Sequence, residues 1–143
     1  MLVLASDVAT GASASPVDLT GLSFAYEPNS RYIFDMHMFT ISSASTNGHG
    51  FQVNTTTAVN KVGLLFVHQL AASGTLSGGS SVAVDSTIAT SNGTPSTTEV
   101  FSSGKGILVT GSTGGTATFR YKSEGAVLTT CNAESTIIVT KIV

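Results

Sequence analysis

The chain has 143 residues, a length typical of one domain, and only 10% of them are charged, against about 25% in an average protein. Its formal net charge of −2 and six scattered basic residues exclude the clustered positive surface that nucleic acids require. A membrane-spanning helix needs about 18 consecutive apolar residues, and every apolar stretch of this sequence is much shorter. We therefore expect no membrane partner. Serine, threonine and glycine replace the missing charges, and such a weakly solubilising surface favours contact with other protein.

The N-terminal residues 1–20 are small, polar and weakly patterned, so we expect an arm or a loosely held edge segment there. The pattern sharpens at Leu22–Tyr26, which predicts a short strand. That strand should end at Glu27–Ser30, where proline, asparagine and serine favour a turn.

The clearest strand of the sequence runs from Arg31 to Ile41, eleven residues of β-formers without glycine or proline. Alternation places four of its side chains on one face: Tyr32, Phe34, Met36 and Met38. It places five on the other: Ile33, Asp35, His37, Phe39 and Ile41. Both sets contain apolar groups, so the strand should be central in a sheet or covered on both sides.

Further short strands are predicted to follow, with few residues between them that could form a helix. Their expected ranges are 51–54, 62–70, 107–109, 116–122, 126–131 and 136–143. The turn signal Asn47-Gly48 just before them suggests that His49 lies in an exposed loop. Strands broken by turns every 8–12 residues or so are typical of an all-β sandwich or barrel. We therefore predict a single domain over 1–143, an antiparallel β-sandwich of the jelly-roll-like kind.

A long Ser/Thr/Gly-rich excursion, residues 73–99, interrupts this regularity. It contains a single apolar alternation, at Val82, Val84 and Ile88, which predicts one or two edge strands. Exposed edges pair readily with other chains. We therefore expect an intersubunit contact in this excursion.

The most suggestive pair of reactive residues is Asp35 and His37, two apart on one strand face. A carboxylate that orients an imidazole is half of a hydrolytic triad, and His49 or His68 could complete a metal site. No nucleophile stands in a recognisable turn, and Cys131 has no neighbouring base. We therefore predict an interface role for Asp35 and His37, and no catalytic residue, metal or cofactor.

Three stretches together resemble a known group of proteins. They are Leu19–Phe24 followed by Asn29–Phe34, then Thr118–Glu124, then Ser135–Ile142. In this order, around a Gly/Thr-rich middle, they resemble small structural proteins of tailed-bacteriophage virions. That group includes head decoration (cement) proteins and the β-sandwich modules of fibres. The resemblance implies a jelly-roll-like fold, self-association and attachment to a virion, and it supplies no catalytic residues.

Within that group we expect a capsid decoration protein, because the sequence shows no shaft repeat of a fibre. Such a protein binds the shell surface and stabilises it by bridging subunits, here through residues 1–20 or 73–99. Its partners would be the major capsid protein, or another virion protein, and copies of itself in a dimer or trimer. The alternative is a receptor-binding fibre module, and an enzyme is the least favoured hypothesis.

Overall fold

The structure, a computed structural model, describes residues 1–11, 14–44, 47–69, 76–84, 88–89 and 98–142. Every regular element in these ranges is a β-strand, which confirms the predicted all-β class. The strands are β1 (Leu2–Val3), β2 (Val8–Ala9), β3 (Val17–Tyr26), β4 (Arg31–Ser42), β5 (His49–Thr55), β6 (Val59–Gln69), β7 (Leu76–Ser81), β8 (Ile88–Ala89), β9 (Val100–Thr110), β10 (Gly115–Ser123), β11 (Thr129–Cys131) and β12 (Thr136–Ile142). Among the described residues there is no helix long and apolar enough to cross a membrane.

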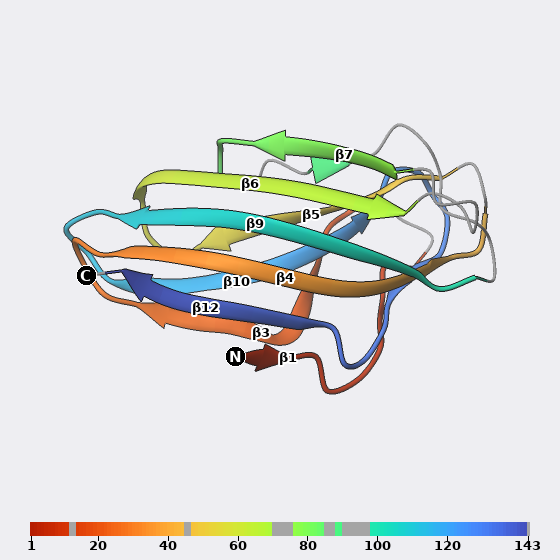
Figure 1. Cartoon of the computed structure of the whole chain (residues 1–143), viewed down its shortest axis with the longest axis horizontal. Coiled ribbons are helices and arrows are strands. Elements are labelled where there is room, and N and C mark those ends of the chain that lie inside the picture. Colours follow the sequence, from red (N-terminus) through yellow and green to blue (C-terminus); the bar gives the residue numbers. More distant parts are fainter. Residues whose placement is uncertain (12–13, 45–46, 70–75, 85–87, 90–97, 143) are drawn as a thin grey trace.

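The strands form two antiparallel sheets that pack face to face (Figure 1). The eight-stranded sheet has the order β1-β12-β4-β9-β6-β7, and β11 adds β2 beside the far end of β4. The four-stranded sheet has the order β3-β10-β5-β8 and lies behind it in Figure 1. This arrangement confirms the predicted antiparallel sandwich, while its jelly-roll character stays a prediction.

Strand β4 is central in the eight-stranded sheet, between β12 and β9. The face led by Phe34 and Met36 is buried against the other sheet, as the alternation predicts. The opposite face, which begins with Arg31 and Ile33, is not covered by any described part of this chain. The sequence predicted that this strand is central in a sheet or covered on both faces. In the structure β4 is central, and the described residues cover only one of its faces.

Strand β9 is far longer than the predicted 107–109. The prediction was short because the first half of β9 is poor in β-formers. Its glycines are required by packing between the sheets. A Cβ on Gly104 would lie 2.4 Å from the Phe66 ring, and one on Gly106 would lie 2.6 Å from Leu64 Cδ2. Since real Cβ atoms do not approach so closely, these glycines make room for the large side chains of β6.

The core between the sheets has an apolar end and a polar end. At the apolar end, Phe34 and Phe119 meet edge to face with ring centroids 5.3 Å apart. Buried polar side chains gather at the other end, including His49, His68 and Ser102. His49 and His68 share a hydrogen bond, so this end of the core is held partly by polar pairing.

The described parts of residues 1–20 (1–11 and 14–20) run along the edges of the sandwich. Strand β1 pairs with β12, β2 pairs with β11, and β3 forms the edge of the four-stranded sheet. Leu4 and Leu19 are buried in the core. This segment is therefore bound to the domain as edge strands.

The excursion 73–99 supplies an edge strand to each sheet. Its first described part, β7, pairs with β6, and β8 pairs with β5 of the other sheet. This part of the chain therefore borders the sandwich on the side opposite to β1 and β2.

Candidate interaction surface

The outward side of the eight-stranded sheet is unusually apolar, and we call it the apolar face. It consists of the outward side chains of β12, β4, β9, β6 and β7, together with Val3 of β1. Nine of the twelve large hydrophobic side chains that are exposed in the described residues point outward here: Val3, Ile33, Leu65, Val67, Leu76, Phe101, Ile107, Ile138 and Ile142. Contiguous apolar patches of this kind mark interaction sites more often than free surface.

The register of the strands places these residues in rows across the sheet. Ile33 lies opposite Ile107, and Ile138 lies beside Asp35 in the next row. On the far side of β9, Leu65 lies opposite Lys105. The apolar groups therefore recur in every row of the sheet, with threonine, serine and glycine residues between them and one pair of charges near the centre.

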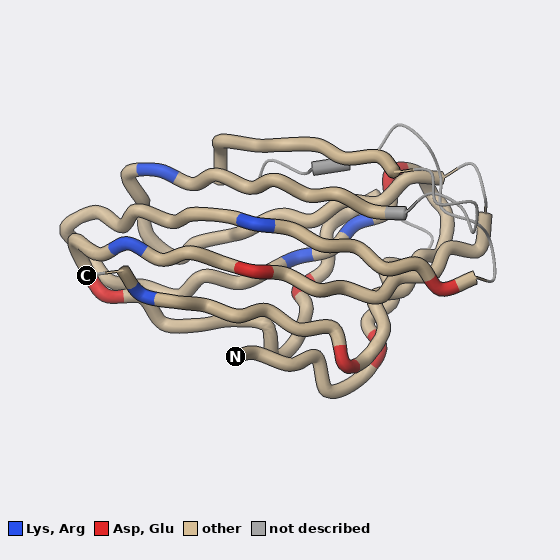
Figure 2. The backbone as a smooth tube through the Cα atoms, in the orientation of Figure 1, with Lys and Arg blue, Asp and Glu red and all other residues tan. Residues whose placement is uncertain are grey.

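That pair, Asp35 and Lys105, lies near the middle of the apolar face. The Lys105 Nζ is 3.2 Å from Asp35 Oδ1, and both side chains remain substantially exposed. Figure 2 shows these two charges on neighbouring strands, while most other charges of the front sheet lie toward its ends. An exposed ion pair contributes little to the stability of the chain itself.

Beside the ion pair lies a small group of rings. His37 stacks on Phe101 with ring centroids 6.1 Å apart and an interplanar angle of 19°. Phe39 meets the same Phe101 at 5.4 Å. Aromatic groups that are exposed in a free chain and clustered are typical anchors of protein interfaces.

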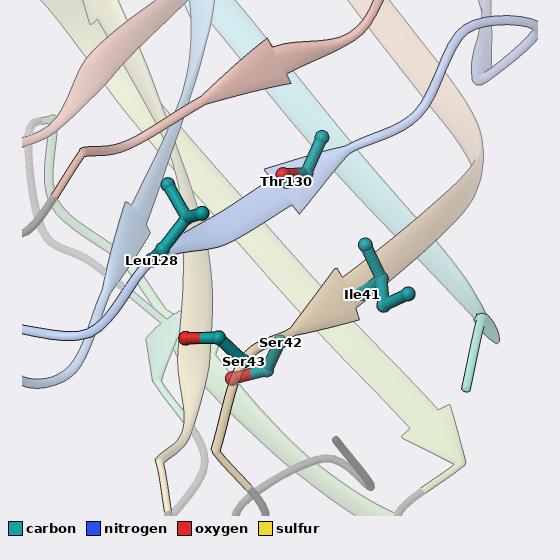
Figure 3. Close-up of a pocket in the computed structure, with 5 residues that line it drawn as sticks. All are labelled: Ile41, Ser42, Ser43, Leu128 and Thr130. Atoms are coloured by element: carbon teal, nitrogen blue, oxygen red, sulfur yellow. The ribbon is translucent and has the colours of Figure 1, made fainter. Parts of the chain in front are cut away.

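Three shallow hollows of the structure lie on this side of the molecule. Two are lined by β6 and β9, from Leu65 and Val67 to Ile107. The third lies at the end of β4 and β11, where Ile41, Leu128 and Thr130 converge (Figure 3). All three are open and mostly apolar, so they are better suited to receive side chains of another protein than a small polar substrate.

The outward side of the four-stranded sheet, which we call the polar face, is different. Its central strand β10 presents Thr118, Arg120 and Lys122. The Arg120 Nε bonds Asp18 Oδ1 at 2.8 Å, across to the edge strand β3. This face is therefore polar, as the sequence predicted for β10, and it is partly covered within the chain, because Gln52 of β5 beside Arg120 is buried.

The residues that the sequence singled out for an interface lie in different surroundings. Asp35 and His37 lie on the apolar face, as described above. Val82 is 86% exposed and lines one of the hollows at the margin of that face.

Val84 does not share the exposure of Val82, because it packs against the core. The expected strand alternation of these two residues is therefore wrong: β7 ends at Ser81, before them. Ile88 belongs to β8, but its side chain lies outside the described residues.

Asp35 and His37 have separate partners, the Lys105 ammonium and the Phe101 ring. Cys131 is buried, and burial raises the pKa of its thiol to about 12. A thiol with so high a pKa is a poor nucleophile. Among the described residues, no group of three or more His, Cys, Asp or Glu side chains could hold a metal ion.

The interior holds a histidine cluster, and here the prediction of an exposed His49 is wrong. His49 is buried at the start of β5, and its Nε2 shares a hydrogen bond of 2.7 Å with His68 Nδ1 of β6. Thr40 Oγ1 lies 3.4 Å from the same Nε2. His68 is fully buried as well.

Burial lowers the pKa of both histidines. The pKa of His68 falls from 6.5 to about 4, and the pKa of His49 is lowered well below 6.5, first by burial and also by repulsion from His68. One ring must also accept the shared hydrogen bond, which requires that ring to be neutral. The cluster thus joins the two sheets as an uncharged polar contact.

Sequence reasoning missed most of the apolar face. Leu65 and Val67 alternate with the inward Leu64 and Phe66, so β6 is apolar on both sides, as β4 is. Two strands that are apolar on both sides, β4 and β6, were the available signal. In an antiparallel sandwich, such a pattern indicates that a second face is covered by something outside the chain.

Comparisons with known proteins identify no relative: neither a family model, a curated protein nor a solved structure matches this chain.

Proposed function

We propose that this chain is a structural protein of a virus particle, a capsid decoration protein of the tailed-bacteriophage kind. It would bind the shell surface and stabilise the shell by bridging neighbouring subunits, as a homo-oligomer with the major capsid protein as its partner. The observation that carries the proposal is the apolar face. A sandwich with one water-suited face and one apolar face is built to be covered by protein.

The interior supports the same role. The histidines with lowered pKa values are buried and bonded to each other, and the thiol is buried. Titratable groups at catalytic sites are instead accessible from a cleft. The proposed function accordingly includes no enzymatic activity.

The direct test is binding of the purified chain to empty shells of the major capsid protein encoded in the same genome. We expect saturable co-sedimentation and a higher disruption temperature of the shells. A chain that stays in the supernatant at every ratio would contradict the proposal. Binding to host cells in place of shells would favour the fibre module.

Substitutions are better tools for this test than deletions. Removing residues 1–20 would remove the buried Leu4 and Leu19, and unfolding would then mask any loss of bridging. A double variant, Leu65→Ser with Ile107→Ser, changes only exposed side chains, and by weakening the association between copies it should lower the number of copies bound per shell. Thr118→Ser on the polar face is the matched control and should bind as the unaltered chain does.

A further inference from the structure

We propose that the apolar face is a two-fold interface between two copies of this chain. The inference rests on the proposed function in taking the chain to be an assembling structural protein, and it names the partner of one surface. Three observations support a second copy over an unrelated partner: the size of the face, the single location of the exposed apolar groups, and the order of residues within it.

The size of the face suits a stable dimer. From Arg31 to Phe39 along β4, and across five strands from β12 to β7, it measures about 30 Å by about 24 Å, or about 700 Å². A standard interface buries about 800 Å² on each partner. A face-to-face contact between two such sheets therefore reaches the usual size without any rearrangement.

The location of the apolar groups favours a two-fold contact over a ring. A head-to-tail contact joins two different patches on each copy, whereas a two-fold contact uses one patch twice. In the described part of the chain, the exposed large hydrophobic side chains outside the apolar face are Leu128 and Val82, at its margins, and Met1. No second apolar patch is present there to complete a head-to-tail contact.

The order of residues makes the face complementary to itself. Consider a two-fold axis in the plane of the interface that runs parallel to the strands, between β4 and β9. Rotation about this axis places β4 of one copy over β9 of the other. The register then sets Ile33 over Ile107 and Phe39 over Phe101 of the second copy. The same axis sets β12 over β6, and hence Ile138 over Leu65.

The central pair of charges obeys the same symmetry, and two further basic residues, Arg31 and Lys61, lie at one end of the face. Asp35 and Lys105 are opposite each other in the register, so each lies over the other residue of the second copy. The one acid and the one base at the centre thus form two ion pairs across the interface. Closing the interface also removes water from these pairs, which strengthens them.

A charge-swap experiment tests this arrangement without disturbing the core. Asp35→Lys and Lys105→Asp each place two like charges on the face of the same chain, so each variant alone should be monomeric. We expect sedimentation equilibrium to show the unaltered chain as a dimer and a dissociation constant at least about 30-fold higher for either variant. Thermal unfolding at low concentration should be nearly unchanged, because both side chains are exposed.

The decisive step is to mix the two variants. Lysines of one chain then face aspartates of the other, and a heterodimer should form with an affinity within about fivefold of the unaltered dimer. A monomer of the unaltered chain at about 100 µM, a trimer, or a mixture that stays monomeric would each overturn the inference. Shell binding by a monomeric chain would preserve the proposed function, whereas a dimer that ignores shells would overturn only that function.

Discussion

The two outer faces of this sandwich are built from the same kind of strand but differ in composition. Strand β10 alternates a buried Phe119 and Tyr121 with Thr118, Arg120 and Lys122 on the polar face. Strands β4 and β6 bury one row and expose a second apolar row. Both faces belong to sheets that are held by the same core. We therefore place the proposed interface on the apolar face.

The largest expected effect comes from a charge at the centre of the apolar face. Ile107→Glu would bury an unpaired carboxylate in the dimer, at a cost of about 3 kcal/mol or more, and should raise the dissociation constant at least about 100-fold. The measurement is sedimentation equilibrium over a range of concentrations. Thr118→Glu on the polar face is the matched control, and its dissociation constant should change less than about twofold. Equal effects of the two substitutions would remove the distinction between the faces.

The histidine cluster separates folding from association. Because the folded pKa of His68 is about 4 and its unfolded pKa is 6.5, the unfolded chain binds more protons between these values. The free energy of unfolding should therefore fall by about 3 kcal/mol as the pH falls from about 6.5 to about 4, with a further loss from His49. Urea unfolding at several pH values measures this slope.

The exposed histidine of the apolar face provides the control for that measurement. His37→Gln should leave the slope in place, since its ring is outside the core. A free energy of unfolding that stays flat from pH 6.5 to pH 5 would show that the buried pair is not held neutral.

A smaller effect is expected from the rings of the apolar face. Phe101→Ser removes the group on which both His37 and Phe39 pack, and it should weaken the dimer about tenfold. Its control is Val82→Ser, an almost fully exposed side chain at the margin, with an expected change below about twofold. If Val82→Ser weakened the dimer more than Phe101→Ser, the interface would be centred on the excursion 73–99.

The smallest effect is expected on the polar face. Asp18→Asn breaks the ion pair with Arg120, whose acid is mostly exposed, and should lower the free energy of unfolding by less than about 1 kcal/mol. The dissociation constant should not change. Thermal and urea unfolding check the first statement, and a weaker dimer would contradict the assignment of this face to water.

Sequence reasoning recovered the elements whose pattern is local. The alternation of Tyr32, Phe34 and Met36 defines β4 almost to its ends, and that of Phe119 and Tyr121 defines β10. It recovered little of β9, because Gly104 and Gly106 are chosen by the side chains packed against them from other strands. No local pattern carries that information.

The same limit explains the two residues that were placed wrongly. His49 follows a turn signal, yet it starts β5 and pairs with Ser123 of β10, a partner far away in the sequence. Val84 follows β7 and packs against the core, whereas Val82 does not. Asp35 and His37 were placed on one face correctly, but the face itself became apparent only when β12, β9 and β6 were aligned beside β4.

The most direct test asks whether the two outer faces differ in their access to water when the chain assembles. Ser103→Cys and Thr118→Cys place one thiol on each face, while the native Cys131 stays buried. With a water-soluble maleimide, the thiol at position 103 should react at least about tenfold more slowly once the chain is concentrated above its dissociation constant. The thiol at position 118 should react at the same rate throughout. Equal rates at position 103 in dilute and concentrated solution would contradict a covered apolar face.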